Sequence, residues 1–170
     1  METERLILRR WLPSDFEPFA ALNADPRIME FYPATLSREE TAAFISRIED
    51  KFERQGFGFW ALEEKATGSF VGFTGLDVPV FTAHFMPCVE IGWRLALQFW
   101  GKGLATEAAS SALSHGFGPA SLKEIVSFTT RDNVRSQAVM QRIGMTRAPA
   151  GDFEHPSLPE GHRLRPHILY

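Results

Sequence analysis

The residues best suited to chemistry lie between Val89 and Ala109. A strand-like apolar run leads into residues 98–103, with the sequence QFWGKG, and a helical pattern begins immediately afterwards. Glycine allows the backbone to turn tightly and to approach a bulky group closely. The first N–H groups of a helix have no partner within it, and they lie at the positive end of the helix dipole. The segment therefore predicts a site for phosphate or pyrophosphate, to which Lys102 could add charge.

Two common nucleotide-binding loops do not match this segment. A Walker A loop would need Ser or Thr after its Gly-Lys pair, whereas Gly103 follows Lys102. A G-x-G-x-x-G fingerprint would need a third glycine where the chain has Thr106. The spacing thereby excludes a P-loop or dinucleotide-binding enzyme. For the loop taken alone, an ordinary strand-to-helix turn stays an alternative.

A second polar element follows the next strand-like run. Asn133-x-x-Ser136 opens a helical segment that ends with QRIGM, residues 141–145. Together with the loop, this pattern resembles the GNAT acetyltransferase superfamily. Q-x-x-G-x-G at residues 98–103 is similar to its pyrophosphate loop, and WGKGLATEA, residues 100–108, is similar to the branch that acetylates ribosomal-protein N-termini, called RimJ/RimL-like. The resemblance extends over essentially the whole chain. It leaves little support for the alternative that residues 98–103 form only an ordinary strand-to-helix turn.

The resemblance implies the GNAT acyl-CoA N-acyltransferase fold, a mixed α/β architecture in which about four helices flank a mostly antiparallel, splayed central sheet. It implies a single domain over residues 1–170 that uses acetyl-CoA as co-substrate and no metal. Loop N–H groups would bind the pyrophosphate, strand backbone and Asn133 the pantetheine arm, and Arg142 a nucleotide phosphate. The implied cofactor-binding residues are Leu95, Ala96, Leu97, Gln98, Phe99, Gly101, Lys102, Gly103, Leu104, Ala105, Asn133, Ser136 and Arg142.

The resemblance also points to two catalytic residues. Glu90, in the string EIGW, is the candidate general base that deprotonates the acceptor amine, directly or through water. The alternative is a carboxylate that pairs with an arginine or orients the substrate ammonium. Ser136 is the candidate hydrogen-bond donor to the leaving thiolate, because Met140 stands where many GNAT enzymes have a tyrosine general acid. A helix-surface serine is the alternative there.

The implied acceptor site combines aromatic rings with a carboxylate, a setting that suits a cationic amine. Its residues are Phe31, Tyr32, Trp93, Phe153, Glu154 and His155. Each ring could instead be ordinary core. The implied reaction is transfer of acetyl from acetyl-CoA to a primary amine, on a protein N-terminus or a small molecule, by direct attack in a ternary complex. A non-catalytic acyl-CoA-binding or sensing module is the alternative, which the missing tyrosine keeps open.

Composition limits the partners. The formal net charge is −3 and Lys and Arg form no cluster, so nucleic acid is not an expected partner. The single cysteine, Cys88, rules out a disulfide framework, fits a reducing cytoplasm and is expected to be an inert buried thiol. The histidines lack the spacing of a metal site, and no apolar stretch is long enough to span a membrane. Monomer and homodimer both stay open.

The elements that position these residues are predicted from periodicity and capping. Strands are expected at residues 5–11, 57–64, 69–77, 88–97, 124–130 and 165–170, and helices at 14–23, 38–55, 102–117 and 133–143. Ser14 with Glu17, and Ser37 with Glu40, are expected to form capping boxes. Gly56 is expected to end the second helix. The order β-α-α-β-β-β-α-β-α-β-β indicates a mixed α/β domain.

Overall fold

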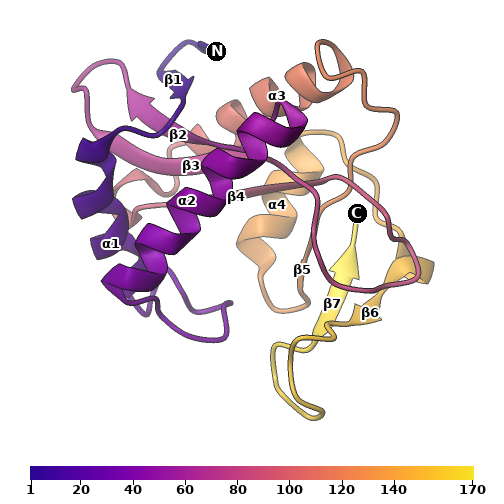
Figure 1. Ribbon diagram of the computed structural model, residues 1–170. Coiled ribbons are helices and arrows are strands. Elements are labelled where there is room, and N and C mark those ends of the chain that lie inside the picture. Colours follow the sequence, from indigo (N-terminus) through magenta and orange to yellow (C-terminus); the bar gives the residue numbers. More distant parts are fainter.

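The computed structural model describes all residues 1–170 (Figure 1), and its elements follow the predicted order. One antiparallel sheet has the strand order β1 (Leu6–Arg9), β2 (Phe59–Glu64), β3 (Phe70–Asp77) and β4 (Glu90–Leu95). A second has the order β5 (Phe128–Thr130), β7 (Pro166–Leu169) and β6 (Phe153–Glu154). The α-helices are α1 (Phe16–Ala24), α2 (Arg38–Gln55), α3 (Leu104–Phe117) and α4 (Val134–Arg142), and the 3₁₀ helices are η1 (Pro13–Asp15), η2 (Leu97–Phe99) and η3 (Pro149–Gly151).

Helices cover both faces of the four-stranded sheet. Phe73 of β3 packs its ring against Phe19 of α1 and Phe44 of α2, with centroid distances of 5.9 and 5.8 Å. Leu76 points to the other face, where its side chain lies 3.0 Å from the position that a Cβ on Gly116 of α3 would take. Burial of a ring such as Phe19, which is 0% exposed, contributes about 1.5–3 kcal/mol. Thus α1 and α2 lie on one face, with α2 crossing in front of the strands in Figure 1, and α3 covers the other.

The two sheets touch at one point and then diverge. Glu90 and Val126 form an isolated parallel bridge, in which the Ile91 N–H donates to the Val126 carbonyl at 2.8 Å. Beyond it, β5 pairs with β7 and not with β4. The predicted splay is therefore present. It also explains why β5 is shorter than the predicted strand over residues 124–130, since the chain leaves the β4 ladder before β5 begins.

The start and end of α2 agree with the sequence. The Ser37 hydroxyl accepts the Glu40 N–H at 3.2 Å, and the Glu40 carboxylate accepts the Ser37 N–H at 2.7 Å. Gly56 follows the helix with a φ of 77°, a left-handed conformation that glycine adopts without strain. Ile48 and Phe52 of this helix are buried in the core. The predicted capping box of Ser37 and Glu40 is therefore confirmed.

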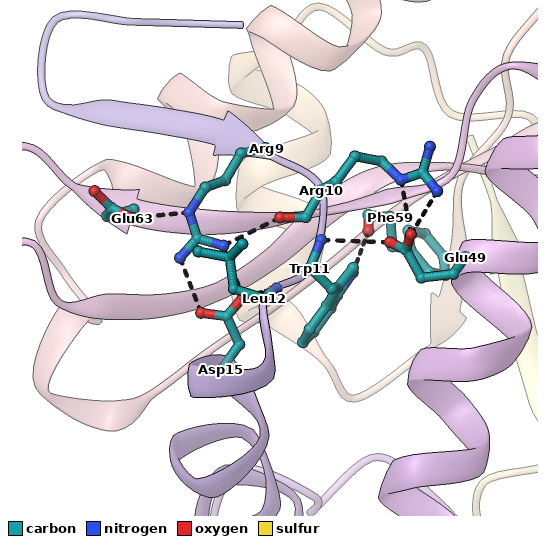
Figure 2. A network of polar contacts seen from close by, with 8 residues as sticks. All are labelled: Arg9, Arg10, Trp11, Leu12, Asp15, Glu49, Phe59 and Glu63. Carbon is teal, nitrogen blue, oxygen red and sulfur yellow. Dashed lines mark hydrogen bonds and ion pairs between the residues drawn. The ribbon is translucent and has the colours of Figure 1, made fainter.

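The predicted cap of α1 is wrong. Ser14 is exposed and lies within η1, so its hydroxyl does not begin the helix. The residue that organises this turn is Asp15, which is 2% exposed. Its carboxylate accepts two hydrogen bonds from the Arg9 guanidinium, at 2.7 and 2.9 Å, and one from the Leu12 N–H at 2.8 Å (Figure 2). A partner on β1, ahead of the turn, thus decides how the chain enters α1.

Candidate functional site

The predicted phosphate-binding loop connects β4 to α3. Gly101 and Gly103 have φ values of 72° and 79°, so the helix cannot begin before Leu104, two residues later than predicted. The N–H groups of residues 101–106 form no hydrogen bond within the protein. Six donors are therefore available at the positive end of a 14-residue helix, an arrangement that fits phosphate groups.

The segment before β1 braces this loop. The Arg5 guanidinium donates to the Lys102 carbonyl at 2.8 Å and to the Glu107 carboxylate at 2.7 Å. The Arg5 N–H donates to the same carboxylate at 2.8 Å. The start of α3 is thereby tied to the segment before β1. Sequence reasoning missed this role, because no local pattern connects residues about a hundred positions apart.

A cavity of about 570 Å³ lies between the end of β4, the loop and α4. Nine of the predicted cofactor-binding residues line it, namely Leu95, Phe99, Gly101, Gly103, Leu104, Ala105, Asn133, Ser136 and Arg142. The other four, Ala96, Leu97, Gln98 and Lys102, do not line it. Gln98 and Lys102 are exposed, and the Ala96 N–H donates to the Val71 carbonyl within the sheet at 2.9 Å.

The free edge of β4 supplies further donors to this cavity. Alternate residues of a strand direct their N–H groups to opposite edges. Because the N–H of Ile91 points to Val126, those of Trp93 and Leu95 point to the same edge, beyond the place where the two sheets part. Loop donors for phosphates together with an open strand edge for an extended amide chain fit the chemistry of coenzyme A.

Asn133 and Ser136 lie at the start of α4. Asn133 is the N-cap residue, and its side-chain oxygen accepts the Ser136 N–H at 3.2 Å. Its side-chain nitrogen donates to the Thr129 and Ser136 hydroxyls at 3.0 and 3.1 Å. The amide of Asn133 is thus committed largely to its own helix. Asn133 contributes to the cavity by orienting the Ser136 hydroxyl, whose own proton stays free to be donated.

A second cavity of about 370 Å³ adjoins the first. The residues lining both are Phe31, Tyr32, Trp93, Arg94, Asn133 and Ser136. Three predicted acceptor-site residues are therefore at the junction, and His155 lines the second cavity. The two remaining predictions, Phe153 and Glu154, line neither. Phe153 stacks on Phe81 at a centroid distance of 5.8 Å, and Glu154 is exposed beside Arg165.

Glu90 lies half-buried in the second cavity, at the first residue of β4. Its partner in the β3–β4 register is Asp77, which forms an ion pair with Lys51 of α2. Burial raises the pKa of Glu90 to about 8, the charge of Asp77 adds to the rise, and Lys51 opposes it. Glu90 therefore becomes a base near pH 8, close to the pKa of ~8 of a peptide α-amino group.

Two histidines and a cysteine near Glu90 have pKa values shifted toward their neutral forms. Burial lowers the pKa values of His155 and His167, and their mutual proximity, 5.0 Å between ring centroids, also lowers that of His155. Burial raises the pKa of the Cys88 thiol to about 11, as expected for an inert thiol. No group of three or more His, Cys, Asp or Glu side chains is placed to hold a metal ion.

The chain is similar to acetyltransferases of known sequence and structure. A family model described as an acetyltransferase (GNAT) domain matches residues 5–146. The uncharacterized protein YkkB of Bacillus subtilis (strain 168), whose name states no activity, is 30% identical over 127 residues, 75% of this chain and 73% of that protein. The acetyltransferase structure from Agrobacterium tumefaciens str. C58 is 26% identical with a TM-score of 0.79, covering 100% of this chain and 92% of that one.

A structure of spermidine N-acetyltransferase from Vibrio cholerae, in complex with CoA and spermine, shares the fold at 18% identity and a TM-score of 0.72, covering 97% of this chain and 93% of that one. The chain belongs to the GNAT acetyltransferase family. It is an acetyl-CoA-dependent N-acetyltransferase, and the predicted fold is confirmed. None of its helices has both the length and the apolar character needed to cross a bilayer.

Proposed function

We propose that this enzyme transfers the acetyl group of acetyl-CoA to a primary amine by direct attack in a ternary complex, in the manner of the RimJ/RimL-like branch that its motifs resemble. The main observation that supports the proposal is the junction of the two cavities. Six unpaired N–H groups suited to phosphates lie on one side of it, and a carboxyl group suited to an amine lies on the other. Donor and acceptor can therefore bind together, with their reacting ends near Trp93 and Ser136.

Acetyl-CoA, when bound, supplies an activated acetyl thioester. Glu90 takes a proton from the acceptor ammonium, directly or through water, and so frees the amine to attack. A backbone N–H near Trp93 to Leu95 donates a hydrogen bond to the thioester oxygen as negative charge develops on it. The Ser136 hydroxyl donates a hydrogen bond to the departing sulfur, a weaker form of help than full protonation by a tyrosine.

Two measurements test the proposal. Calorimetry with coenzyme A is expected to show binding, and thiol release from acetyl-CoA is expected only when a primary amine is added. Binding without release in the presence of any amine would favour the alternative, a non-catalytic acyl-CoA-binding module. Absence of binding heat would remove the cofactor site itself.

A matched pair of glycine variants locates the cofactor site. Gly101 and Gly68 have φ values of 72° and 68°, and a Cβ would meet no atom within 4 Å at either position. Gly101→Ala and Gly68→Ala should each cost about 1–2 kcal/mol of stability through the left-handed backbone. Only Gly101→Ala, in the loop, should weaken coenzyme A binding, by about tenfold. Equal affinities in the two variants would contradict the loop assignment.

A further inference from the structure

Arg94 is a buried guanidinium group without a carboxylate partner. The residue is 8% exposed. Its Nη1 donates to the side-chain oxygen of Asn23 at 2.6 Å, and its buried Nε has no hydrogen-bond partner. None of the ion pairs in the protein includes it. Buried charges in proteins are normally paired, so this arrangement needs an explanation.

Aromatic rings account for only part of the stabilisation. The Arg94 guanidinium lies 4.0 Å from the ring centroid of Tyr32, 5.3 Å from that of Phe73 and 5.7 Å from that of Phe44. Ring faces attract the cation but accept few of its five N–H donors. A planar fork of donors is suited to a carboxylate, which it can bind through two parallel hydrogen bonds. The missing partner is therefore expected to come from a bound molecule.

The position of Arg94 connects that partner to the reaction. Arg94 lines both cavities, so an anion bound there lies at the junction where donor and acceptor meet. Glu90 lies four residues earlier on the same face of β4, at the other end of the acceptor cavity. Gly92 stands between them, and a Cβ there would lie 3.3 Å from the ring of Phe59. The ring of Phe59 therefore covers Gly92, and it forms an apolar floor between the two charged groups.

We infer that the acceptor carries a carboxylate close to its amine, as a free amino acid or an acidic peptide N-terminus does, and that Arg94 binds this carboxylate while the amine lies toward Glu90. The inference rests on the proposed acetyl transfer and specifies its substrate class. It disfavours a polyamine, because a second ammonium group at the junction would meet the like charge of the Arg94 guanidinium.

The test compares acceptors that differ in one charge. The twenty L-amino acids are assayed for kcat/KM against their carboxamides, and peptides with Glu at the second or third residue against the same peptides with Gln. A carboxamide has the less basic amine, so without a carboxylate contact it should be the better acceptor near neutral pH. The inference predicts the reverse by at least about thirtyfold in one of the two series, which identifies the source of the carboxylate.

Variants then assign the preference to Arg94. Arg94→Gln should abolish it, Arg94→Lys should retain part of it, and Arg47→Gln should keep it. Arg47 is an exposed arginine whose guanidinium lies at the same 5.7 Å from the Phe44 ring as that of Arg94. Because the preference of the wild-type enzyme is measured first, the inference stays testable even if Arg94→Gln fails to fold.

Three outcomes would overturn the inference while leaving acetyl transfer in place. Equal use of acids and amides by the wild-type enzyme would leave acetyl transfer intact and remove the carboxylate. If Arg94→Lys lowered kcat equally with every amine, Arg94 would act on the thioester of acetyl-CoA and not on the acceptor. If spermidine were acetylated in preference to every carboxylate-bearing acceptor, the acceptor site would favour a positive charge where the inference expects a negative one. Coenzyme A binding without thiol release from any amine would refute the proposed function, and with it the inference.

Discussion

The carboxyl groups of Glu90 and Asp77 belong to directly opposed residues of the β3–β4 ladder. Opposed residues on neighbouring strands point to the same face, so the two acids lie together beneath α2. Asp77 takes the ion pair with Lys51, while the pKa of Glu90 is raised to about 8. The pair thus divides into one carboxylate held by a lysine and one carboxyl group that titrates in the range where amines do.

The pH dependence of the reaction should follow this pair. If Glu90 is the base, kcat/KM rises with pH and levels off above about 8, as its carboxyl loses its proton. Asp77→Asn removes a negative charge that raises the pKa of Glu90, so the rise should move to lower pH. Lys51→Met removes the positive charge that lowers the pKa of Glu90, so the rise in kcat/KM should move to higher pH.

Glu90→Gln should lower kcat by about 10²-fold and remove the part of the rise that belongs to its carboxyl group, leaving only the part that belongs to deprotonation of the amine itself, measured from pH 6 to 9 with one amine. A profile that keeps its shape in Glu90→Gln would mean that the residue only orients the substrate.

The same residue should make the fold less stable in alkaline solution. The pKa of Glu90 is raised from 4.5 in the unfolded chain to about 8 in the folded one. The folded state therefore binds more protons between these pH values, and the stability that Glu90 contributes at low pH is lost as pH rises through 8.

Glu90→Gln removes this loss, so its melting temperature should equal or exceed that of the wild-type protein at pH 9. Thermal melts of both proteins at pH 5 and pH 9 check this, and a wild-type protein that is the more stable one at pH 9 would contradict it.

Ser136→Ala should lower kcat by up to about tenfold, the loss expected for one hydrogen bond, while leaving the Kd for acetyl-CoA almost unchanged. Asn133→Ala removes both the cap of α4 and the hydrogen bond that orients Ser136. It should therefore lower kcat as well and, unlike Ser136→Ala, reduce stability by about 1 kcal/mol. Single-turnover rates and chemical denaturation separate the two effects. An unchanged kcat in Ser136→Ala would exclude this hydroxyl from the reaction.

Arg5→Ala should weaken acetyl-CoA binding although Arg5 lines neither cavity. Without its bonds to Lys102 and Glu107, the loop loses its brace, and the Glu107 carboxylate in the first turn of α3 is left without its cation near the phosphates. We expect the Kd measured by calorimetry to rise about threefold to tenfold.

Arg10→Ala is the control for Arg5→Ala. Arg10 bonds to Glu49 of α2 (Figure 2) and to Glu53 of the same helix, away from the loop. Its side chain is 47% exposed, against 45% for Arg5. A similar rise in the Kd of both variants would indicate a general loss of stability rather than a brace.

Asp15→Ala should lower the free energy of unfolding by about 2–3 kcal/mol. It removes one partner of a buried ion pair, although Arg9 keeps its bond to Glu63 at 2.8 Å (Figure 2). Ser14→Ala, at an exposed position without a capping bond, should change the stability by less than about 0.5 kcal/mol. Urea denaturation measures both. A larger loss in Ser14→Ala would restore the serine as the cap of α1.

Sequence reasoning succeeds where the signal is local. The capping box of Ser37 and Glu40 closes within one turn, and Gly56 ends the same helix through its own backbone. The turn at residues 101–103 depends likewise on the glycines within it. Each of these features is decided by residue types a few positions apart, so the pattern indicates the geometry directly.

The sequence by itself determined the element order, the glycine loop that begins α3 and the membership of Asn133 and Ser136 in one helix start. Only the tertiary structure decided that Asp15 rather than Ser14 organises the entry to α1, that Arg5 braces the loop, and that Phe153 lines neither cavity. It also brought Asp77 opposite Glu90 and left Arg94 buried without a carboxylate. These relationships join residues far apart in the chain, where charge pairing and packing across elements outweigh local preference.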